Sequence, residues 1–309
     1  MTDVARLDFT GERFTPECVR EIWYEHWHRY VFARAFATGK RVLDAACGEG
    51  YGSALLADVA ESVLGVDVAR QAVDHARVRY GGRANLKFVQ GDCTVLDVEP
   101  ASFDLIVSFE TLEHVAAHEA LTAGFAKALA PGGMLIVSSP DKRTYSEVNG
   151  YRNEFHVREL YREELLALLG AHFPHVRLYG QKLLFQSAIW ALDGSPRTVD
   201  ARTATGTSEP DSGLRYDPLY FIAVCSQEQL PRDLPELALF GDREESVYQH
   251  YNDEVRKNMS AGARLAELEA ENIELRHKVD SVPAAGLSCA PAVAPHRPWW
   301  QRLFGRHSS

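Results

Sequence analysis

Between residues 41 and 139, five short apolar runs alternate with segments of helical pattern. The runs read RVLDA, SVLGVDV, LKFVQ, FDLIVS and MLIVSS. Strands that alternate with helices form βαβ units, in which the strands are parallel and the helices cover both faces of the sheet. The pattern therefore predicts an α/β domain built on a parallel sheet.

The flanking segments extend this domain over residues 1–228. Before the first run, EIWYEHWHRYVFARAF places Trp23, Trp27, Tyr30 and Val31 at helical spacing, which predicts a helix packed on the sheet. After the last run come a helix in YREELLALLG and two strands in HVRLYG and LYFIAVC. The polar DGSPRTVDARTATGTSEPDSG between those strands reads as a surface loop.

Past residue 228 the chain changes character. Residues 229–250 read as a proline-punctuated linker, and residues 251–280 carry a short coiled-coil pattern. Its stripe is Asn258, Ala261, Leu265, Leu268, Asn272, Leu275 and Val279. Asn in such a stripe favours a parallel two-stranded pairing, so we expect a homodimer. The alternative is a single amphipathic helix lying back on the domain.

The C-terminal end differs in charge from the rest. Residues 281–298 are rich in Ala and Pro and are expected to be a disordered linker. Residues 299–309 combine Trp299 and Trp300 with arginines, as in segments that contact the surface of an anionic membrane. Docking on a partner protein, or disorder, is the alternative.

Bulk composition excludes several classes of protein. The formal net charge of −10 argues against a nucleic-acid partner. The five cysteines are scattered without a CxxC pair, which predicts free thiols in a reducing compartment. We see no signal peptide and no run of apolar residues long enough to span a bilayer. The expected location is cytoplasmic, with peripheral contact at the inner membrane face through the tail.

The loop after the first run reads VLDAACGEGYG, with glycines at positions 48, 50 and 52. Such a loop can cradle a phosphate, but Asp44 at the strand end would repel one. A carboxylate there suits a cation. S-adenosylmethionine carries an ammonium and a sulfonium and no phosphate, so the charges match this ligand and not a dinucleotide.

Three further features follow in the order that this ligand requires. Asp67 ends the second run, about 20 residues beyond the first glycine, where a carboxylate can accept hydrogen bonds from both ribose hydroxyls. Asp92 ends the third run and is suited to accept from the adenine amino group. The fourth run continues into FETLEHV, whose backbone can meet the methionine end.

These motifs make the chain resemble class I S-adenosylmethionine-dependent methyltransferases, in the branch that includes the ubiquinone-biosynthesis-type enzymes. VLDAACGEG, GVD, GDC, SFETLEHV and LAPGGMLIVSSP carry the resemblance, strongly over residues 40–140 and more loosely over residues 10–228. It implies a Rossmann-like, seven-stranded, mostly parallel sheet with an antiparallel last strand. GERFTPE, EHWHRY, SSPDKRTYS and NEFHVREL are similar to a subgroup from bacterial surface-polysaccharide clusters, where Asn is common at the position of Asp141.

The resemblance also implies the cofactor-binding residues. They are Asp44, Gly48, Glu49 and Gly50 at the methionine end, Asp67 and Val68 at the ribose, Asp92 and Cys93 at the adenine, and Phe109 and Glu110 after the fourth strand.

A sugar hydroxyl is too weak an acid to be methylated unaided, so a general base or a metal is expected to help. The candidates are His156 in NEFHVREL, and Glu113 and His114 after the fourth strand. His156 could instead cap a helix beginning near Arg158, and Glu113 could cap another. His26 and His28 cannot share a metal, because residues two apart on a helix point in different directions. We expect no metal site.

We therefore expect a methyltransferase that modifies a hydroxyl of a sugar or glycan in surface-polysaccharide biosynthesis. One alternative acceptor is a small molecule, such as a quinone precursor or a natural product. The other alternative is a non-catalytic scaffold that binds the nucleoside only for stability.

Overall fold

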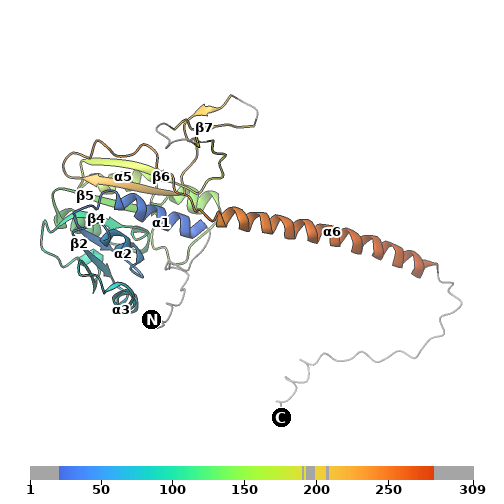
Figure 1. Cartoon of the computed structure of the whole chain (residues 1–309), viewed down its shortest axis with the longest axis horizontal. Helices are drawn as coiled ribbons and strands as arrows, with labels where there is room; N and C mark the ends of the chain where they lie inside the picture. Colours follow the sequence, from blue (N-terminus) through green and yellow to red (C-terminus); the bar gives the residue numbers. More distant parts are fainter. Residues whose placement is uncertain (1–20, 190, 193–198, 207–208, 282–309) are drawn as a thin grey trace, which may run out of the picture. The chain divides into compact units, whose positions relative to one another are not determined.

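A computed structural model of the chain describes residues 21–189, 191–192, 199–206 and 209–281 (Figure 1). The chain divides into two compact units, Met1–Val247 and Tyr248–Ser309. The first holds the β-sheet, and the second holds most of one long helix, α6 (Ser246–Asp280). Apart from residue 281, the expected disordered linker and the basic aromatic tail lie outside the described residues.

Seven strands form one sheet in the order β3-β2-β1-β4-β5-β9-β6 (Figure 1). They are β1 (Arg41–Ala45), β2 (Ser62–Asp67), β3 (Leu86–Gln90), β4 (Phe103–Ser108), β5 (Leu129–Pro140), β6 (His175–Gln181) and β9 (Tyr220–Ser226). Neighbours among β1 to β5 pair in parallel, whereas β9 is antiparallel to both β5 and β6. The predicted strands and the antiparallel last strand are therefore confirmed.

Helices cover both faces of the sheet, because successive strand residues point to opposite sides. The helices are α1 (Glu21–Arg34), α2 (Tyr51–Ala57), α3 (Arg70–Tyr80), α4 (His118–Ala128) and α5 (Arg162–Gly170). Residues of α1, α2 and α3 join Val42 and Leu105 in one core cluster. Residues of α4 and α5 join Leu43 and Ile106 in the other. The alternation along β1 and β4 thus divides one sheet between two cores.

Helix α1 packs on the sheet as predicted, but through a different set of residues. Tyr30 and Ala33 are buried, and Trp23 and Trp27 pack against the same core. Val31 is 40% exposed, so the prediction that it packs inward is wrong. Tyr30, one position earlier, belongs to the buried face of the helix, whereas Val31 points to solvent.

Two segments outside the main elements are more ordered than their composition indicated. Within the expected surface loop, β7 (Arg202–Thr203) pairs with β8 (Asp211–Ser212) in a short antiparallel ladder. Within the segment expected as a linker, Leu234 is 6% exposed and belongs to a core cluster. Phe240 lies 5.4 Å from Trp23, ring centroid to ring centroid. The first compact unit therefore includes residues 229–247.

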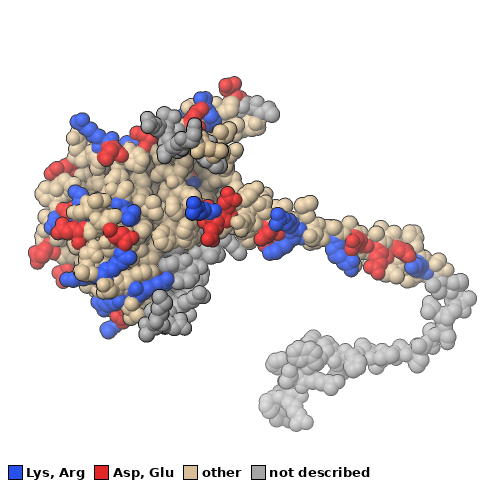
Figure 2. All heavy atoms as spheres, viewed as in Figure 1, with Lys and Arg blue, Asp and Glu red and all other residues tan. Residues whose placement is uncertain are grey.

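Surface charge and hydropathy agree with the composition. On the face seen in Figure 2, acidic and basic side chains are interspersed over the first unit. None of the helices in the described ranges combines the length and apolar character needed to span a bilayer.

The strand order indicates where a ligand-binding crevice would lie, at the carboxyl edge of the sheet. Strand β1 lies between β2 and β4, so the chain leaves β1 toward one side and later returns on the other. In open α/β sheets, ligands bind outside the carboxyl ends of the strands at such a switch point. The glycine loop, Asp67 and Phe109 all lie at this edge.

Candidate functional site: the carboxyl edge of the sheet

The loop after β1 is a tight turn with a left-handed backbone. Gly48 has a φ of 55° and Gly50 a φ of 90°, values that L residues rarely adopt. At Gly50, a Cβ atom would also lie 2.8 Å from Ala76 Cβ and 2.9 Å from the Phe88 ring. Ala46 has a φ of 61° although it is not a glycine. The turn brings bare backbone to the crevice, and Ala46 bears strain within it.

Asp44 places a buried carboxylate directly behind this loop. It is fully buried and accepts hydrogen bonds from Ser53 Oγ at 2.5 Å and from Tyr30 Oη at 3.1 Å. Burial raises the pKa of Asp44 to about 7; the two hydrogen bonds oppose that shift, and Asp67 adds to it. A carboxylate in this setting would gain from a nearby cation.

Asp67 joins the glycine loop to the end of β2. Its two carboxylate oxygens accept hydrogen bonds from the backbone N–H groups of Gly48 and Ala69, each at 2.8 Å. The residue is 7% exposed, at the edge where a ribose would lie. The predicted ribose contact therefore involves a carboxylate that already orders the loop.

The other residues predicted around the ribose and the adenine lie just after β2 and β3. Asp92 is exposed and accepts from the Thr94 N–H at 2.8 Å, which caps a single 3₁₀ turn that includes Cys93. The Cys93 side chain is buried, and Val68 is 67% exposed. Their roles at the adenosine remain predictions.

Glu49 faces away from the crevice toward α3. Its buried carboxylate lies 2.7 Å from Arg79 Nη1 and 2.9 Å from His75 Nε2, and it accepts from Tyr80 Oη at 3.0 Å. These contacts fasten the loop to α3. Glu49 would therefore contact the cofactor only through its backbone atoms.

The exit of β4 is held in an unusual backbone conformation. Glu110 has a φ of 49°, and its N–H donates to Ser138 Oγ at 2.9 Å. The same hydroxyl donates to Glu110 Oε1 at 2.6 Å. Phe109 packs edge-to-face on Tyr30, with ring centroids 5.0 Å apart. The fourth strand thus meets the crevice with fixed geometry, as the prediction for Phe109 and Glu110 requires.

Arg29 of α1 is a further candidate site residue, which the sequence analysis did not identify. It is 2% exposed, yet neither Nη atom makes a hydrogen bond to a described residue. Its Nε donates to Gln181 Oε1 at 2.8 Å, and Nη2 lies 3.5 Å from Glu110 Oε1. A buried guanidinium with unfilled donors beside the β4 exit suits an anionic group, such as the carboxylate of methionine. The available signal was a charged residue beside the aromatic residues of a helix that packs on the sheet.

His156 and Glu159 form a tight pair in the loop that follows β5. His156 Nδ1 lies 2.6 Å from Glu159 Oε1, and Nε2 lies 3.0 Å from the amide nitrogen of Asn153. These contacts fit the tautomer in which Nδ1 carries the proton and Nε2 accepts. Helix α5 begins at Arg162, so the alternative that His156 caps a helix near Arg158 is not seen.

Glu113 and His114 lie next to His156. Their turn, Leu112–His114, precedes α4, and the backbone carbonyl of Glu113 accepts from the Val157 N–H at 2.7 Å. The Glu113 carboxylate is buried without a hydrogen-bond partner among the described residues, and burial raises its pKa well above the usual range. The rings of His114 and His156 lie 5.0 Å apart. The structure therefore brings the three catalytic candidates together.

The same three side chains could hold a cation. Glu113, His114 and His156 each offer one ligand atom, and these atoms lie within 4.8 Å of one another. The sequence spacing did not predict this cluster, because His156 comes from a separate loop. The arrangement fits two roles, a general base and a site for a divalent cation.

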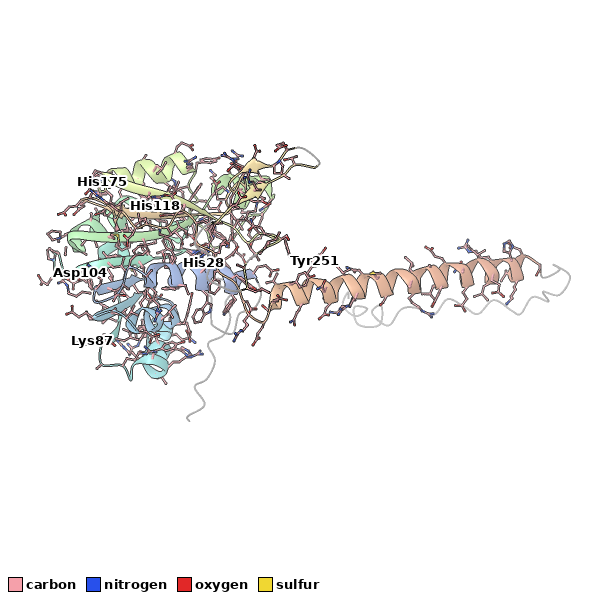
Figure 3. The ribbon with its side chains drawn as sticks, turned by 45° about the horizontal axis from the view of Figure 1, so that its top comes forward. His28, Lys87, Asp104, His118, His175 and Tyr251 are labelled. Atoms are coloured by element: carbon pink, nitrogen blue, oxygen red, sulfur yellow. The ribbon has the colours of Figure 1, made fainter. Side chains whose placement is uncertain are left out.

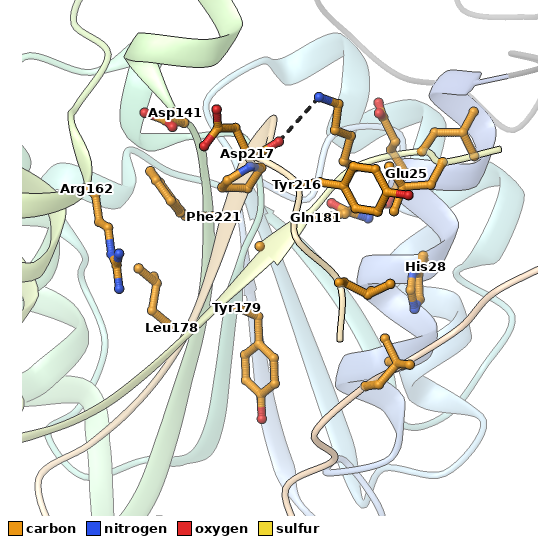
Figure 4. Close-up of a pocket in the computed structure, with 18 of the residues that line it drawn as sticks. Glu25, His28, Asp141, Arg162, Leu178, Tyr179, Gln181, Tyr216, Asp217 and Phe221 are labelled. Carbon is orange, nitrogen blue, oxygen red and sulfur yellow. Dashed lines mark hydrogen bonds between the residues drawn. The ribbon is translucent and has the colours of Figure 1, made fainter. Parts of the chain in front are cut away.

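A cavity of about 630 Å³ adjoins the site on the side of β6 and α1 (Figure 4). The aromatic side chains that line it include Tyr24, His28, Tyr179, Tyr216 and Phe240. Gln181 and Glu25 also line it, and Gln181 is the residue that accepts from Arg29 Nε. One glutamine therefore separates this cavity from the buried guanidinium at the β4 exit. His28 stacks on Phe240, with ring centroids 5.5 Å apart.

Comparison with known proteins agrees with this geometry. Residues 43–137 match the family model described as "Methyltransferase domain", which spans β1 to most of β5. The chain contains a class I S-adenosylmethionine-dependent methyltransferase domain. The glycine loop, Asp67 and the β4 exit all lie within the matched residues, whereas Arg29 and His156 lie outside them.

Relatives of this methyltransferase domain extend the likeness. A probable S-adenosylmethionine-dependent methyltransferase of Mycolicibacterium smegmatis is 37% identical over 53% of this chain and 63% of its own length. One from Mycobacterium tuberculosis is 37% identical over 57% and 65%. A ubiquinone biosynthesis O-methyltransferase of Idiomarina loihiensis is 36% identical over 38% and 50%. The chain thus spans less than two thirds of each relative.

Proposed function

We propose that the protein transfers a methyl group from S-adenosylmethionine to a hydroxyl of a sugar or glycan. The observation that carries the proposal is the His156–Glu159 pair, which places an oriented base beside the predicted donor site. The Idiomarina relative is an O-methyltransferase by name, which supports oxygen as the methylated atom.

The crevice offers a partner for two of the donor's three charged groups, the carboxylate and the ammonium. Arg29 has unfilled donors for the methionine carboxylate, and Asp44 is a buried carboxylate that suits the ammonium. Asp67 stands where the ribose hydroxyls would lie. S-adenosylmethionine supplies an electrophilic methyl group when bound, and the protein must then align the acceptor with it.

His156 would take the acceptor proton. Glu159 holds Nδ1–H and so directs the Nε2 lone pair outward, as the third group does in a catalytic triad. In this structure the side-chain amide of Asn153 donates a hydrogen bond to Nε2. An acceptor hydroxyl would therefore replace Asn153 as the donor to Nε2, and its proton would pass to the imidazole as the oxygen is methylated.

The cavity supports a glycan over a planar small molecule. Aromatic faces pack against the C–H faces of sugars, while carboxylate, amide and guanidinium groups hydrogen-bond to hydroxyls. The lining has both kinds, with Asp141, Arg143, Arg162 and Asp217 beside the aromatic residues. A quinone precursor would leave many of these polar groups without partners. The small-molecule acceptor is for this reason the second candidate and not the first.

Calorimetric titration with S-adenosylhomocysteine tests the donor half of the proposal. We expect binding by the wild type and by Asp74→Ala, an exposed position on α3, and loss of binding by Asp67→Ala. No binding by folded wild-type protein would contradict the methyltransferase proposal.

Transfer of a labelled methyl group tests the acceptor half. The probes are a set of neutral oligosaccharides and a set of catechols, offered at equal concentration. Labelled oligosaccharide with unlabelled catechol supports the glycan proposal. The reverse result would contradict it while leaving the methyltransferase activity in place.

A further inference from the structure

Helix α6 presents an apolar stripe that no described residue of its own unit covers. Every residue from 255 to 281 is exposed, and Leu265, Leu268 and Leu275 have exposed fractions of 58%, 45% and 51%. Side chains project from all sides of the helix beyond Tyr251 (Figure 3). Most helices owe their stability to packing of an apolar face. A partner helix that buries these leucines would provide this stabilising packing.

The stripe follows a heptad repeat. The a positions are Tyr251, Asn258, Leu265, Asn272 and Val279, and the d positions are Glu254, Ala261, Leu268 and Leu275. All nine lie within one continuous helix, Ser246–Asp280. We call residues 258–279 at these positions the α6 seam.

We propose that α6 pairs in parallel and in register with α6 of a second copy of this chain through the α6 seam. The two asparagines select this orientation. In a parallel pair each a residue faces the same a residue of the partner, so Asn258 meets Asn258 and Asn272 meets Asn272 and their amides can hydrogen-bond. In an antiparallel pair, a residues face d residues, and each Asn would be buried against an apolar side chain.

Charges beside the seam select the same register. In a parallel pair, a g residue lies near the e residue five positions later on the partner. The pairs that fall wholly within the seam are Arg264 with Glu269 and Glu271 with Arg276, and both have opposite charges. Two-fold symmetry gives four such contacts. A shift by one heptad would move Arg264 to Arg276 and Glu271 beyond the seam.

Within a single α6 helix, these charged side chains make only weak contacts with neighbouring side chains, and these contacts would compete little with contacts between two helices. Arg264 lies 2.8 Å from Glu267, and Arg276 donates to Asn272 at 2.7 Å, on an exposed surface. Acidic and basic side chains alternate along α6 (Figure 2). Exposed pairs of this kind contribute about 0.5 kcal/mol or less each, so exchanging them for contacts between helices costs little.

Light scattering of the full-length protein tests the pairing. We expect twice the mass of the chain for the wild type, the mass of one chain for Leu268→Asp at position d, and a dimer for the matched Ala270→Asp at position f. Circular dichroism shows whether each variant is folded. A monomeric wild type at roughly 50 μM, where weak protein pairs associate, would overturn the proposal.

Cross-linking tests orientation and register. In a Cys18→Ser/Cys289→Ser background, Leu275→Cys should form a disulfide between chains, because parallel pairing places the two residues face to face. Failure of Leu275→Cys alone, together with cross-linking of Leu275→Cys to Asn258→Cys in a mixture, would show an antiparallel pair and overturn the proposal.

Charge exchange tests the pairs beside the seam. We expect Arg276→Glu and Glu271→Arg each to weaken dimerisation by about fivefold or more, and the double variant to restore it. Equal weakening in the double variant would overturn the register. None of these experiments requires the proposed acceptor or any catalysis, so their outcomes are independent of the proposed function.

Discussion

The Nε atom of Arg29 donates to Gln181 Oε1 at 2.8 Å, although the two residues are 152 positions apart in the chain. Gln181 in turn donates to the backbone carbonyl of Glu25 at 2.9 Å. These bonds hold the guanidinium rigid and leave its Nη atoms for a ligand.

Replacing Arg29 with Met should weaken binding of S-adenosylhomocysteine by about 100-fold, because a buried charge that pairs with a ligand contributes several kcal/mol. Titration calorimetry measures the effect. Met fills a similar volume but leaves Glu110 without its cation, so circular dichroism must first show that the variant is folded. Arg70→Met on exposed α3 is the matched control and should bind as the wild type does. Unchanged affinity in Arg29→Met would exclude the carboxylate contact.

Asp44→Asn should make the ligand-free protein more stable above neutral pH. Burial raises the pKa of Asp44 from its ordinary value of 3.8 to about 7, so ionising it in the folded state is unfavourable. Stability from this group is full below about pH 4 and is lost as pH rises through about 7, by up to a few kcal/mol. Denaturant unfolding at pH 5 and pH 8 should show a smaller decline in the variant than in the wild type.

The same variant should bind S-adenosylhomocysteine poorly, because an amide cannot pair with the ammonium. Greater stability together with weaker binding would show that Asp44 is kept for the ligand. A parallel pH dependence in both proteins would contradict the pKa assignment.

Ala46→Gly should stabilise the protein by about 0.5–1 kcal/mol. A left-handed backbone costs a non-glycine residue about 1–2 kcal/mol, and glycine's greater freedom in the unfolded chain offsets part of the gain. Ala45→Gly is the matched control, since Ala45 is a buried strand residue, and it should destabilise. Thermal and urea unfolding measure both. Destabilisation by Ala46→Gly would mean that the loop bears no strain there.

His156→Gln should lower kcat by about 100-fold or more and leave the donor affinity unchanged, as expected for a lost general base. Glu159→Gln should lower kcat less, because it orients the ring without taking the proton. His175→Gln, at the exposed start of β6 (Figure 3), is the control. A chelator should leave the rate unchanged, because Glu159 and Asn153 already engage both ring nitrogens. Loss of activity on chelation would favour the cation role of this cluster.

The sheet was predictable because each apolar run is short and bounded by helical pattern, and because the motif order matches one fold. Gly48, Gly50 and Asp67 were predictable for a local reason, since each ends a strand or forms the turn after it. Arg29 was not, because its role depends on Gln181 and Glu110, which only folding brings near. The same holds for Glu159, which becomes a partner of His156 through the path of one irregular loop.

The glycine loop after β1 packs against α1, which lies outside the residues that match the family model. A Cβ atom added at Gly52 would lie 2.0 Å from the Tyr30 ring, so helix α1 presses directly on the turn. Tyr30 and Arg29 precede the family match, and β9 and β6 follow it. A fragment cut at the limits of the match would keep the predicted cofactor-binding residues and lose Tyr30, Arg29 and the strands β6 and β9. Domain swaps or minimal versions of this protein should therefore be cut outside residues 21 and 247.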